Sequence, residues 1–194
     1  MSHLSRASAR SAILLLIAML AGALTAALAP DASATPRTSA AELDFAKYQA
    51  VDAHRFQSLR YDDNGRVFFV AGQWRCQLGA QPGSVACKGR PATAPPNTVG
   101  VSIVGDQQGP WWVAPGTTFR FGSVTGFRAP VLKVGQRITF ANTTCAVPRR
   151  NVVACASTNR AFILSRGWHK FYFPRYDRAH SKNPAPKYLP PRLR

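Results

Sequence analysis

Four cysteines are the residues of this 194-residue chain best suited to covalent or metal chemistry. Cys76 and Cys87 form one pair, and Cys145 and Cys155 form another, each at the ends of a strand–turn–strand pattern whose second strand reads Val-Ala-Cys. Opposed residues on antiparallel strands have Cα atoms about 4.5–5.5 Å apart, which a disulfide can bridge. We therefore predict the disulfides Cys76–Cys87 and Cys145–Cys155, and we interpret the two units as one small unit used twice.

A zinc site built from all four cysteines, or a set of reactive thiols, is the alternative interpretation of the same residues. Zinc-binding motifs place cysteines in pairs about two to four residues apart, and the chain has no such pair. We therefore predict that no metal is bound.

His54 and His169 are the candidates for acid–base chemistry, but no recognised motif contains them. The sequence has no His-x-x-x-His or His-Glu pairing and no Gly-x-Ser-x-Gly nucleophile motif. Asp62 and Asp63 begin an Asp-Asp-Asn-Gly run that is typical of a turn. We predict no catalytic residue and no cofactor. The alternative is a secreted wall-modifying hydrolase or nuclease that uses His169 or His54 with Asp106.

Charge is the strongest functional indication. The chain has 25 Lys and Arg against 8 Asp and Glu, which gives a formal net charge of +17, and no carboxylate side chain lies between Gln107 and Tyr176. Basic residues interleaved with aromatic ones are typical of surfaces that bind polyanions. The residues expected to bind anions lie in a turn, in the last strand and in the C-terminal tail: Arg149, Arg150, Lys170, Arg175, Arg178 and Lys182.

The N-terminus has the pattern of an export signal. A basic start precedes an uncharged apolar stretch at 12–29, and Ala32-Ser33-Ala34 fits a signal-peptidase site. We predict cleavage after Ala34, with an uncleaved membrane anchor as the alternative. Disulfides are the default state of cysteines in an exported protein.

An exported basic protein meets anionic cell-wall polymers and acidic lipid head groups rather than nucleic acid. We expect one of these two as the partner of a secreted, envelope-associated protein. A secreted effector or inhibitor that docks a protein partner through Trp111 and Trp112 is a further alternative.

The elements that position these residues are predominantly strands. Ser39 and Glu42 form a capping box that predicts a short helix at 39–50. Beyond residue 65, short β-branched and aromatic runs separated by Gly, Pro and Asn predict strands. These runs lie at 66–70, 73–78, 84–87, 99–104, 111–113, 117–121, 131–134, 137–141, 152–155, 161–164 and 168–173. They indicate a mainly β protein, either a small antiparallel sandwich or a partial barrel.

Four parts make up the expected organisation. They are a cleaved signal peptide at 1–34, a leader with the short helix at 35–65, a disulfide-bonded β domain at 66–173, and a basic Pro-rich tail at 174–194. The tail is rich in proline and poor in residues that build a core, so we expect it to be disordered.

Several motifs of the β domain resemble those of one known family. They are Val67-Phe68-Phe69-Val70-Ala71-Gly72-Gln73-Trp74-Arg75-Cys76, Val85-Ala86-Cys87, Val131-Leu132-Lys133-Val134-Gly135-Gln136-Arg137-Ile138 and Val153-Ala154-Cys155. In these motifs the chain resembles small secreted four-cysteine envelope proteins of actinobacteria, of the mycobacterial and corynebacterial type, over about residues 66–173. The resemblance implies a secreted location and two disulfides, but no particular activity.

Two departures from that family limit what the resemblance implies. Its members often carry Gly-His-Gly-Phe before the final strand, where this chain has Asn159-Arg160-Ala161-Phe162. They also often carry Asp after the second cysteine, where this chain has Lys88. No role of the family histidine therefore transfers to this chain.

Overall fold

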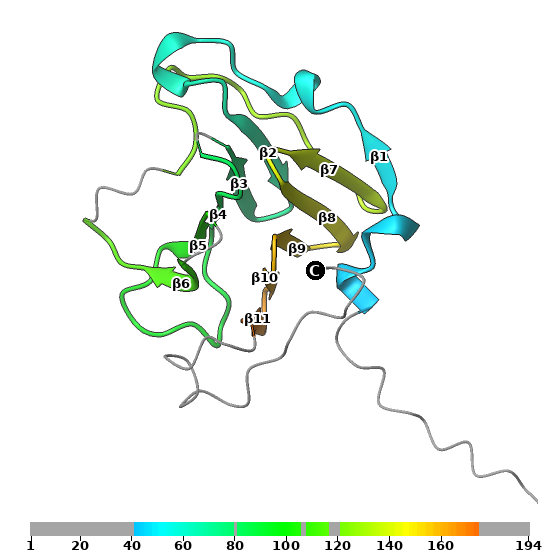
Figure 1. Ribbon diagram of the computed structural model, residues 1–194. Coiled ribbons are helices and arrows are strands. Elements are labelled where there is room, and N and C mark those ends of the chain that lie inside the picture. Colours follow the sequence, from blue (N-terminus) through cyan, green and yellow to red (C-terminus); the bar gives the residue numbers. More distant parts are fainter. Residues whose placement is uncertain (1–40, 80, 106–107, 117–120, 175–194) are drawn as a thin grey trace, which may run out of the picture. The chain divides into compact units, whose positions relative to one another are not determined.

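A computed structural model describes residues 41–79, 81–105, 108–116 and 121–174 (Figure 1). The predicted signal peptide lies outside the described residues, as does the tail beyond residue 174.

The described residues form two sheets, which confirms the predicted mainly β fold. The six-stranded sheet has the order β1 (Gln49–Val51), β7 (Gln136–Phe140), β8 (Thr143–Arg149), β9 (Val152–Ser157), β10 (Arg160–Ser165) and β11 (His169–Tyr172). The five-stranded sheet has the order β2 (Val67–Ala71), β3 (Trp74–Leu78), β4 (Val85–Lys88), β5 (Gly100–Val104) and β6 (Gln108–Val113). Neighbouring strands are antiparallel except for β1 and β7, which are parallel.

The two sheets repeat one pattern. Strands β2–β6 follow one another across their sheet, and β7–β11 do the same in the other. In each run a disulfide joins the second strand to the third, between residues that are direct register partners: Cys76–Cys87 and Cys145–Cys155. Both predicted pairings are confirmed, and the shared order supports the interpretation of one unit used twice.

The two halves also exchange their leading segments. Strand β1 precedes the first run but pairs with β7 of the second. Val131 precedes the second run but bridges in parallel to Val70 of β2. Each half therefore completes the edge of the other half's sheet. The strand predicted at 131–134 is reduced to this single bridge, because the chain passes the edge of β2 and then turns into β7.

The inner faces of the two sheets share one core. Alternate residues of the strands point to the same face, so Val67 and Phe69 of β2 face inward and meet Phe162 and Leu164 of β10 in one buried cluster. Both disulfides belong to this cluster. Removal of this much apolar surface from water is the main favourable contribution to the stability of such a fold.

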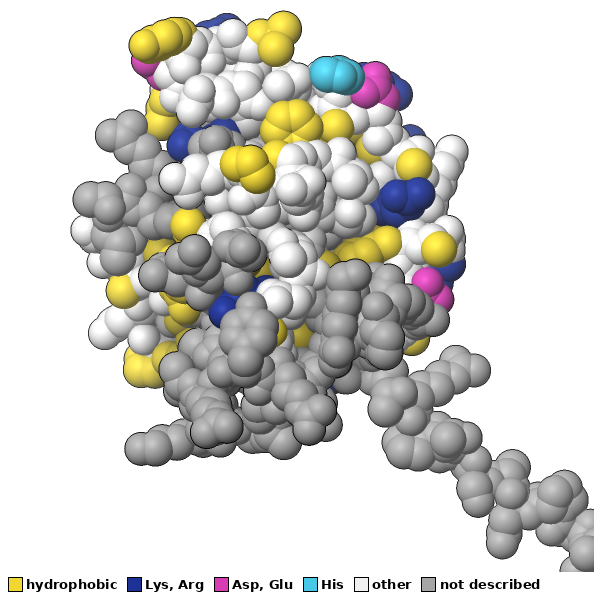
Figure 2. Space-filling view, in the orientation of Figure 1, with side chains coloured by type: hydrophobic (Ala, Val, Ile, Leu, Met, Phe, Trp, Pro, Cys, Tyr) yellow, Lys and Arg dark blue, Asp and Glu magenta, His cyan; other side chains and the backbone are white. Residues whose placement is uncertain are grey.

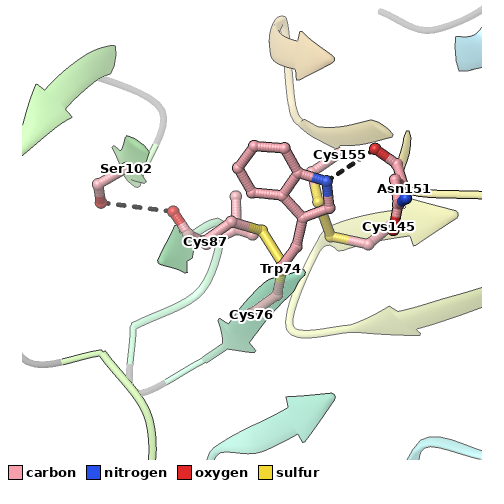
Figure 3. Close-up of a disulfide and its surroundings, with 8 residues drawn as sticks. Trp74, Cys76, Cys87, Ser102, Cys145, Asn151 and Cys155 are labelled. Carbon is pink, nitrogen blue, oxygen red and sulfur yellow. Dashed lines mark hydrogen bonds between the residues drawn. A yellow bond between two sulfur atoms is a disulfide. The ribbon is translucent and has the colours of Figure 1, made fainter. Parts of the chain in front are cut away.

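Trp74 lies between the two disulfides and ties the halves together (Figure 3). Its indole Nε1 donates a hydrogen bond of 3.0 Å to the carbonyl of Asn151 in the β8–β9 turn. A corresponding contact joins the second half to the turn of the first. Ser157 Oγ of β9 donates a hydrogen bond of 2.6 Å to the carbonyl of Gly83 in the β3–β4 turn. The tip of each disulfide hairpin is thus bound by the other half.

The predicted helix at 39–50 was wrong over the described residues of that segment. Ala41–Leu43 (η1) and Phe45–Lys47 (η2) are single 3-10 turns, and β1 follows. Leu43, Phe45 and Tyr48 are buried together against the outer face of the six-stranded sheet, and their spacing does not match one face of an α-helix. A segment this short gains too little from its own hydrogen bonds to form a helix, so packing on the sheet decides its conformation.

Two further 3-10 turns lie between β1 and β2. They are η3 (Ala53–Phe56) and η4 (Tyr61–Asp63). Asp52 caps η3 by accepting a hydrogen bond from the backbone N–H of His54 at 3.0 Å. Phe56 is buried in the shared core, so η3 also closes one end of the sandwich.

Candidate anion-binding site

A pocket of about 620 Å³ lies on the outer face of the five-stranded sheet. Four phenylalanines and three cationic residues line it, together with smaller groups. The aromatic residues are Phe68, Phe69, Phe121 and Phe127, and the cationic ones are Arg75, Lys88 and Arg128. No carboxylate is among the lining residues, so the pocket combines apolar walls with positive charge.

Strand register brings two of the cations together. Arg75 of β3 is the direct partner of Lys88 of β4, one position beyond the Cys76–Cys87 pair. Successive side chains of a strand point to opposite faces, so the buried disulfide directs Arg75 and Lys88 outward to the same side of the sheet. Both side chains are exposed. Like charges that face each other across strands destabilise a sheet, and a bound anion would relieve that repulsion.

The connection from β6 to β7 supplies the opposite wall. Phe121 lies directly on Gly100 of β5, where an added Cβ would come within 2.5 Å of the ring. The backbone N–H of Gly122 donates to Gln77 Oε1 at 3.1 Å, which fixes the segment over β3. Phe127 packs on Phe68 with ring centroids 6.0 Å apart. The absence of a side chain at Gly100 is thus what lets the aromatic wall approach the sheet.

Asp63, at the end of η4, anchors this wall. Its Oδ2 accepts hydrogen bonds of 2.6 Å from each of the hydroxyls of Ser58, Ser123 and Thr125, and its Oδ1 accepts one of 2.9 Å from the backbone N–H of Val124. Burial by itself raises the pKa of Asp63, but the hydrogen bonds from these four groups outweigh burial and hold the pKa well below its ordinary value. The carboxylate is therefore charged and serves as the fixed point of the loop.

No acidic residue of the described chain neutralises the cations of the pocket. All of them lie before the first strand of the pocket sheet: Glu42, Asp44, Asp52, Asp62 and Asp63. Within the described residues the one ion pair joins Arg149 to Glu42, at 3.4 Å. None of the three pocket cations has an ion-pair partner in this part of the chain, so their charge is available to an external anion.

The basic residues predicted to bind anions lie elsewhere. Arg149 and Lys170 approach the same ring, that of Trp168, with the guanidinium and ammonium groups 5.7 and 5.1 Å from its centroid. Arg150 is exposed in the adjacent turn. These residues gather on the outer face of the six-stranded sheet, and Arg149 is partly neutralised by Glu42. Arg175, Arg178 and Lys182 lie outside the described residues.

The tryptophan pair predicted to dock a protein partner is divided between two faces of β6. Trp112 points inward and packs edge-on against His169, with ring centroids 4.7 Å apart, and against Phe171 at 4.9 Å. Trp111 is half-buried on the other face. The two rings therefore do not form one surface.

The histidines considered for catalysis also lie apart. The Nδ1 of His169 is 2.7 Å from the hydroxyl of Thr93, and burial lowers the pKa of His169. His54 is exposed, with its Nδ1 3.1 Å from Gln57 Oε1. The structure does not bring them together, and Asp106 lies outside the described residues.

Sequence reasoning missed Arg75 and Lys88 although a usable signal was present. Each is adjacent in sequence to a cysteine of the first predicted disulfide. Direct cross-strand pairing of Cys76 with Cys87 places Arg75 opposite Lys88 on the outer face, as the register shows. The aromatic wall had no such signal, because it depends on contacts between segments distant in sequence.

Two features are absent from the described residues. In that part of the chain no group of His, Cys, Asp and Glu side chains is placed to hold a metal ion. No helix there is long and apolar enough to cross a membrane. Comparison of the chain with family models, with curated proteins and with solved structures gave no match.

Proposed function

We propose that the protein is a secreted, non-catalytic, envelope-associated protein that binds anionic cell-wall or membrane-surface material through basic residues. In this proposal it shares its secreted location with the small four-cysteine envelope proteins of actinobacteria that its motifs resemble. The observation that carries the proposal is the pocket on the five-stranded sheet. There Arg75, Lys88 and Arg128 surround a cavity with no carboxylate in its lining.

The chemistry of the pocket suits a phosphate or carboxylate group attached to a larger body. An arginine can bind such a group through two parallel hydrogen bonds, and a lysine adds a compact positive charge. The phenylalanines of the lining offer apolar surface to the part of the ligand that carries the anion. The cations beside Trp168 provide a second, more open basic surface for a polymer or a charged membrane.

Two disulfides are consistent with a secreted location, because such bonds persist in oxidising compartments. The export signal predicted at 1–34 points to the same compartment. Anionic wall polymers and acidic lipid head groups are the abundant polyanions there, which is why we propose them rather than nucleic acid.

Sedimentation of the purified protein with isolated cell walls and with anionic vesicles, at low and at high salt, tests the proposal. We compare the wild type with the pocket variant Arg75→Gln, Lys88→Gln, Arg128→Gln. A basic residue near an anionic surface contributes about 1 kcal/mol, so removal of three should weaken binding by about 100-fold at low salt. Binding by the wild type should fade as salt rises, because exposed charges are screened.

The matched control removes three exposed cations that do not line the pocket: Arg55→Gln, Lys133→Gln and Arg166→Gln. It changes the net charge by the same amount, so it reports the effect of charge alone. If both variants lose the same affinity, the pocket is not the binding site. If the wild type binds neither material at low salt, the proposed function is wrong.

A further inference from the structure

Two loops beside the pocket expose large apolar side chains. Leu59 and Tyr61 are 86% and 96% exposed, and Val124 is 44% exposed, whereas most side chains of this kind in the described chain are buried. Tyr61 begins η4 and Leu59 lies two residues before it, whereas Val124 follows Ser123, which lines the pocket. Figure 2 shows hydrophobic side chains projecting at the end of the molecule that carries η4 in Figure 1.

Specific hydrogen bonds hold these two loops together. Asp63 binds the backbone N–H of Val124 and the hydroxyls on either side of it. Arg60, between the two exposed apolar residues, donates from its guanidinium to the carbonyl of Thr125 at 2.8 Å. Leu59, Tyr61 and Val124 therefore form one supported surface, which we call the apolar tip.

The apolar tip is continuous with the basic pocket. Val124 directly follows Ser123, which lines the pocket, and Phe127 and Arg128 of the same loop line it as well. The tip carries one further cation, Arg60, and one carboxylate, Asp62, so its own charge is balanced. The excess positive charge lies in the adjacent pocket.

We propose that the ligand of the pocket is the phosphate head group of an anionic phospholipid, and that the apolar tip enters the membrane surface beside it. This inference rests on the proposed function and narrows it to one partner. A bilayer offers both an anionic layer and an apolar interior within a short depth. A hydrated wall polymer offers the anions but no apolar phase that would cover Leu59 and Tyr61. Aromatic side chains are also favoured at membrane–water interfaces.

The apolar tip and the basic pocket together meet the requirements for reversible membrane binding. Such binding depends on buried apolar area and on attraction to anionic lipids. Neither contribution needs a spanning helix. Asp63 and Arg60 fix the tip in place before binding, so little conformational freedom is lost when it enters the membrane.

Flotation with vesicles tests the inference. The vesicles contain phosphatidylcholine alone or phosphatidylcholine mixed with phosphatidylglycerol, and the soluble polyanion dextran sulfate serves as a probe of charge alone. The tip variant is Leu59→Ser, Tyr61→Ser. Its matched control is Val131→Ser, Val134→Ser, which also changes two exposed apolar residues, 61% and 57% exposed, but outside the tip.

We expect the tip variant to lose at least tenfold in affinity for the mixed vesicles, and to bind dextran sulfate as the wild type does. The control variant should bind both normally. The pocket variant Arg75→Gln, Lys88→Gln, Arg128→Gln should lose both kinds of binding. A Tyr61→Trp variant should show additional fluorescence quenching by lipids brominated on their acyl chains, compared with the wild type.

The outcomes separate the inference from the function on which it rests. If the tip variant binds mixed vesicles as tightly as the wild type, the inference is wrong while the pocket can still bind anions. If the wild type binds isolated cell walls in a salt-sensitive manner but does not bind the mixed vesicles, a wall polymer is the ligand and the inference is overturned. If the pocket variant keeps all its binding, the pocket is not the binding site and the inference is overturned. If the wild type binds neither cell walls nor mixed vesicles at low salt, the proposed function itself fails.

Discussion

Replacement of Asp63 by asparagine should loosen the wall of the pocket and destabilise the protein. Asp63 is 1% exposed and accepts four hydrogen bonds. Ser123 Oγ already accepts from the backbone N–H groups of Thr125 and Phe127, at 3.1 and 3.0 Å, and it donates its own proton to Asp63 Oδ2 at 2.6 Å. An asparagine that turns its amide nitrogen toward the hydroxyls no longer offers Ser123 an acceptor at residue 63. In the opposite orientation the amide nitrogen faces the backbone N–H of Val124. Both groups are donors, so the hydrogen bond from Val124 is lost.

In either orientation at least one hydrogen bond to a charged acceptor is lost, and the others become neutral. A hydrogen bond to a charged group contributes about 1.5–3 kcal/mol. We therefore expect Asp63→Asn to lower the free energy of unfolding by about 2–4 kcal/mol at neutral pH. Urea unfolding followed by tryptophan fluorescence measures this change, provided that the slope against denaturant stays constant.

The loss of unfolding free energy in Asp63→Asn should become smaller as the pH falls below about 4. The folded pKa of Asp63 lies below the value of about 3.9 that an aspartate has in an unfolded chain. Its contribution to stability is therefore fully present above about pH 4 and is lost as the pH falls from there toward the folded pKa, at up to about 1.4 kcal/mol per pH unit. The difference in stability between the wild type and Asp63→Asn should shrink over that window.

Asp62→Asn is the matched control, because it removes the adjacent carboxylate, which is exposed. It should change the free energy of unfolding by less than about 0.5 kcal/mol. If Asp63→Asn costs no more than Asp62→Asn, or if the difference from the wild type does not shrink below pH 4, the account of Asp63 as the anchor is refuted.

Two further substitutions test how the halves and the pocket are packed. Gly100→Ala should cost about 1–3 kcal/mol and weaken anion binding, because the new Cβ would meet the Phe121 ring, whereas Gly167→Ala has open space and should be nearly neutral. Equal denaturation midpoints for these two variants would contradict the placement of Phe121. Trp74→Phe should cost about 2–3 kcal/mol in urea unfolding, since it leaves a cavity between the disulfides and removes the hydrogen bond to Asn151. A loss below about 0.5 kcal/mol would show that the indole does not join the two halves.

The features that the sequence predicted correctly depend on contacts between neighbours along the chain. Each disulfide closes a hairpin in which the cysteines are 11 or 10 residues apart, so alternation and turn residues were enough to pair Cys76 with Cys87 and Cys145 with Cys155. Most strands were predicted for the same reason. They combine β-branched and aromatic residues with flanking Gly, Pro or Asn.

The features that the sequence did not predict depend on distant contacts. The segment at 41–51 has a local signal for a helix, but the outer face of a sheet formed about 100 residues later determines its conformation. The role of Asp63 was hidden for a similar reason. An Asp-Asp-Asn-Gly run indicates a turn, and nothing in it shows that three hydroxyls and an amide from two other segments will bind the second aspartate.

The exchange of leading segments between the two halves makes this chain a natural candidate for a split protein. A cut between β6 and Phe121 leaves two fragments, each with its own disulfide and its own antiparallel run. One fragment keeps β1, whose partner β7 is on the other, and the second keeps Val131, whose partner is in β2 on the first. No disulfide crosses between them. Each fragment therefore carries a segment that pairs with the edge of the other fragment's sheet. These two pairings should direct the fragments to reassemble in one register.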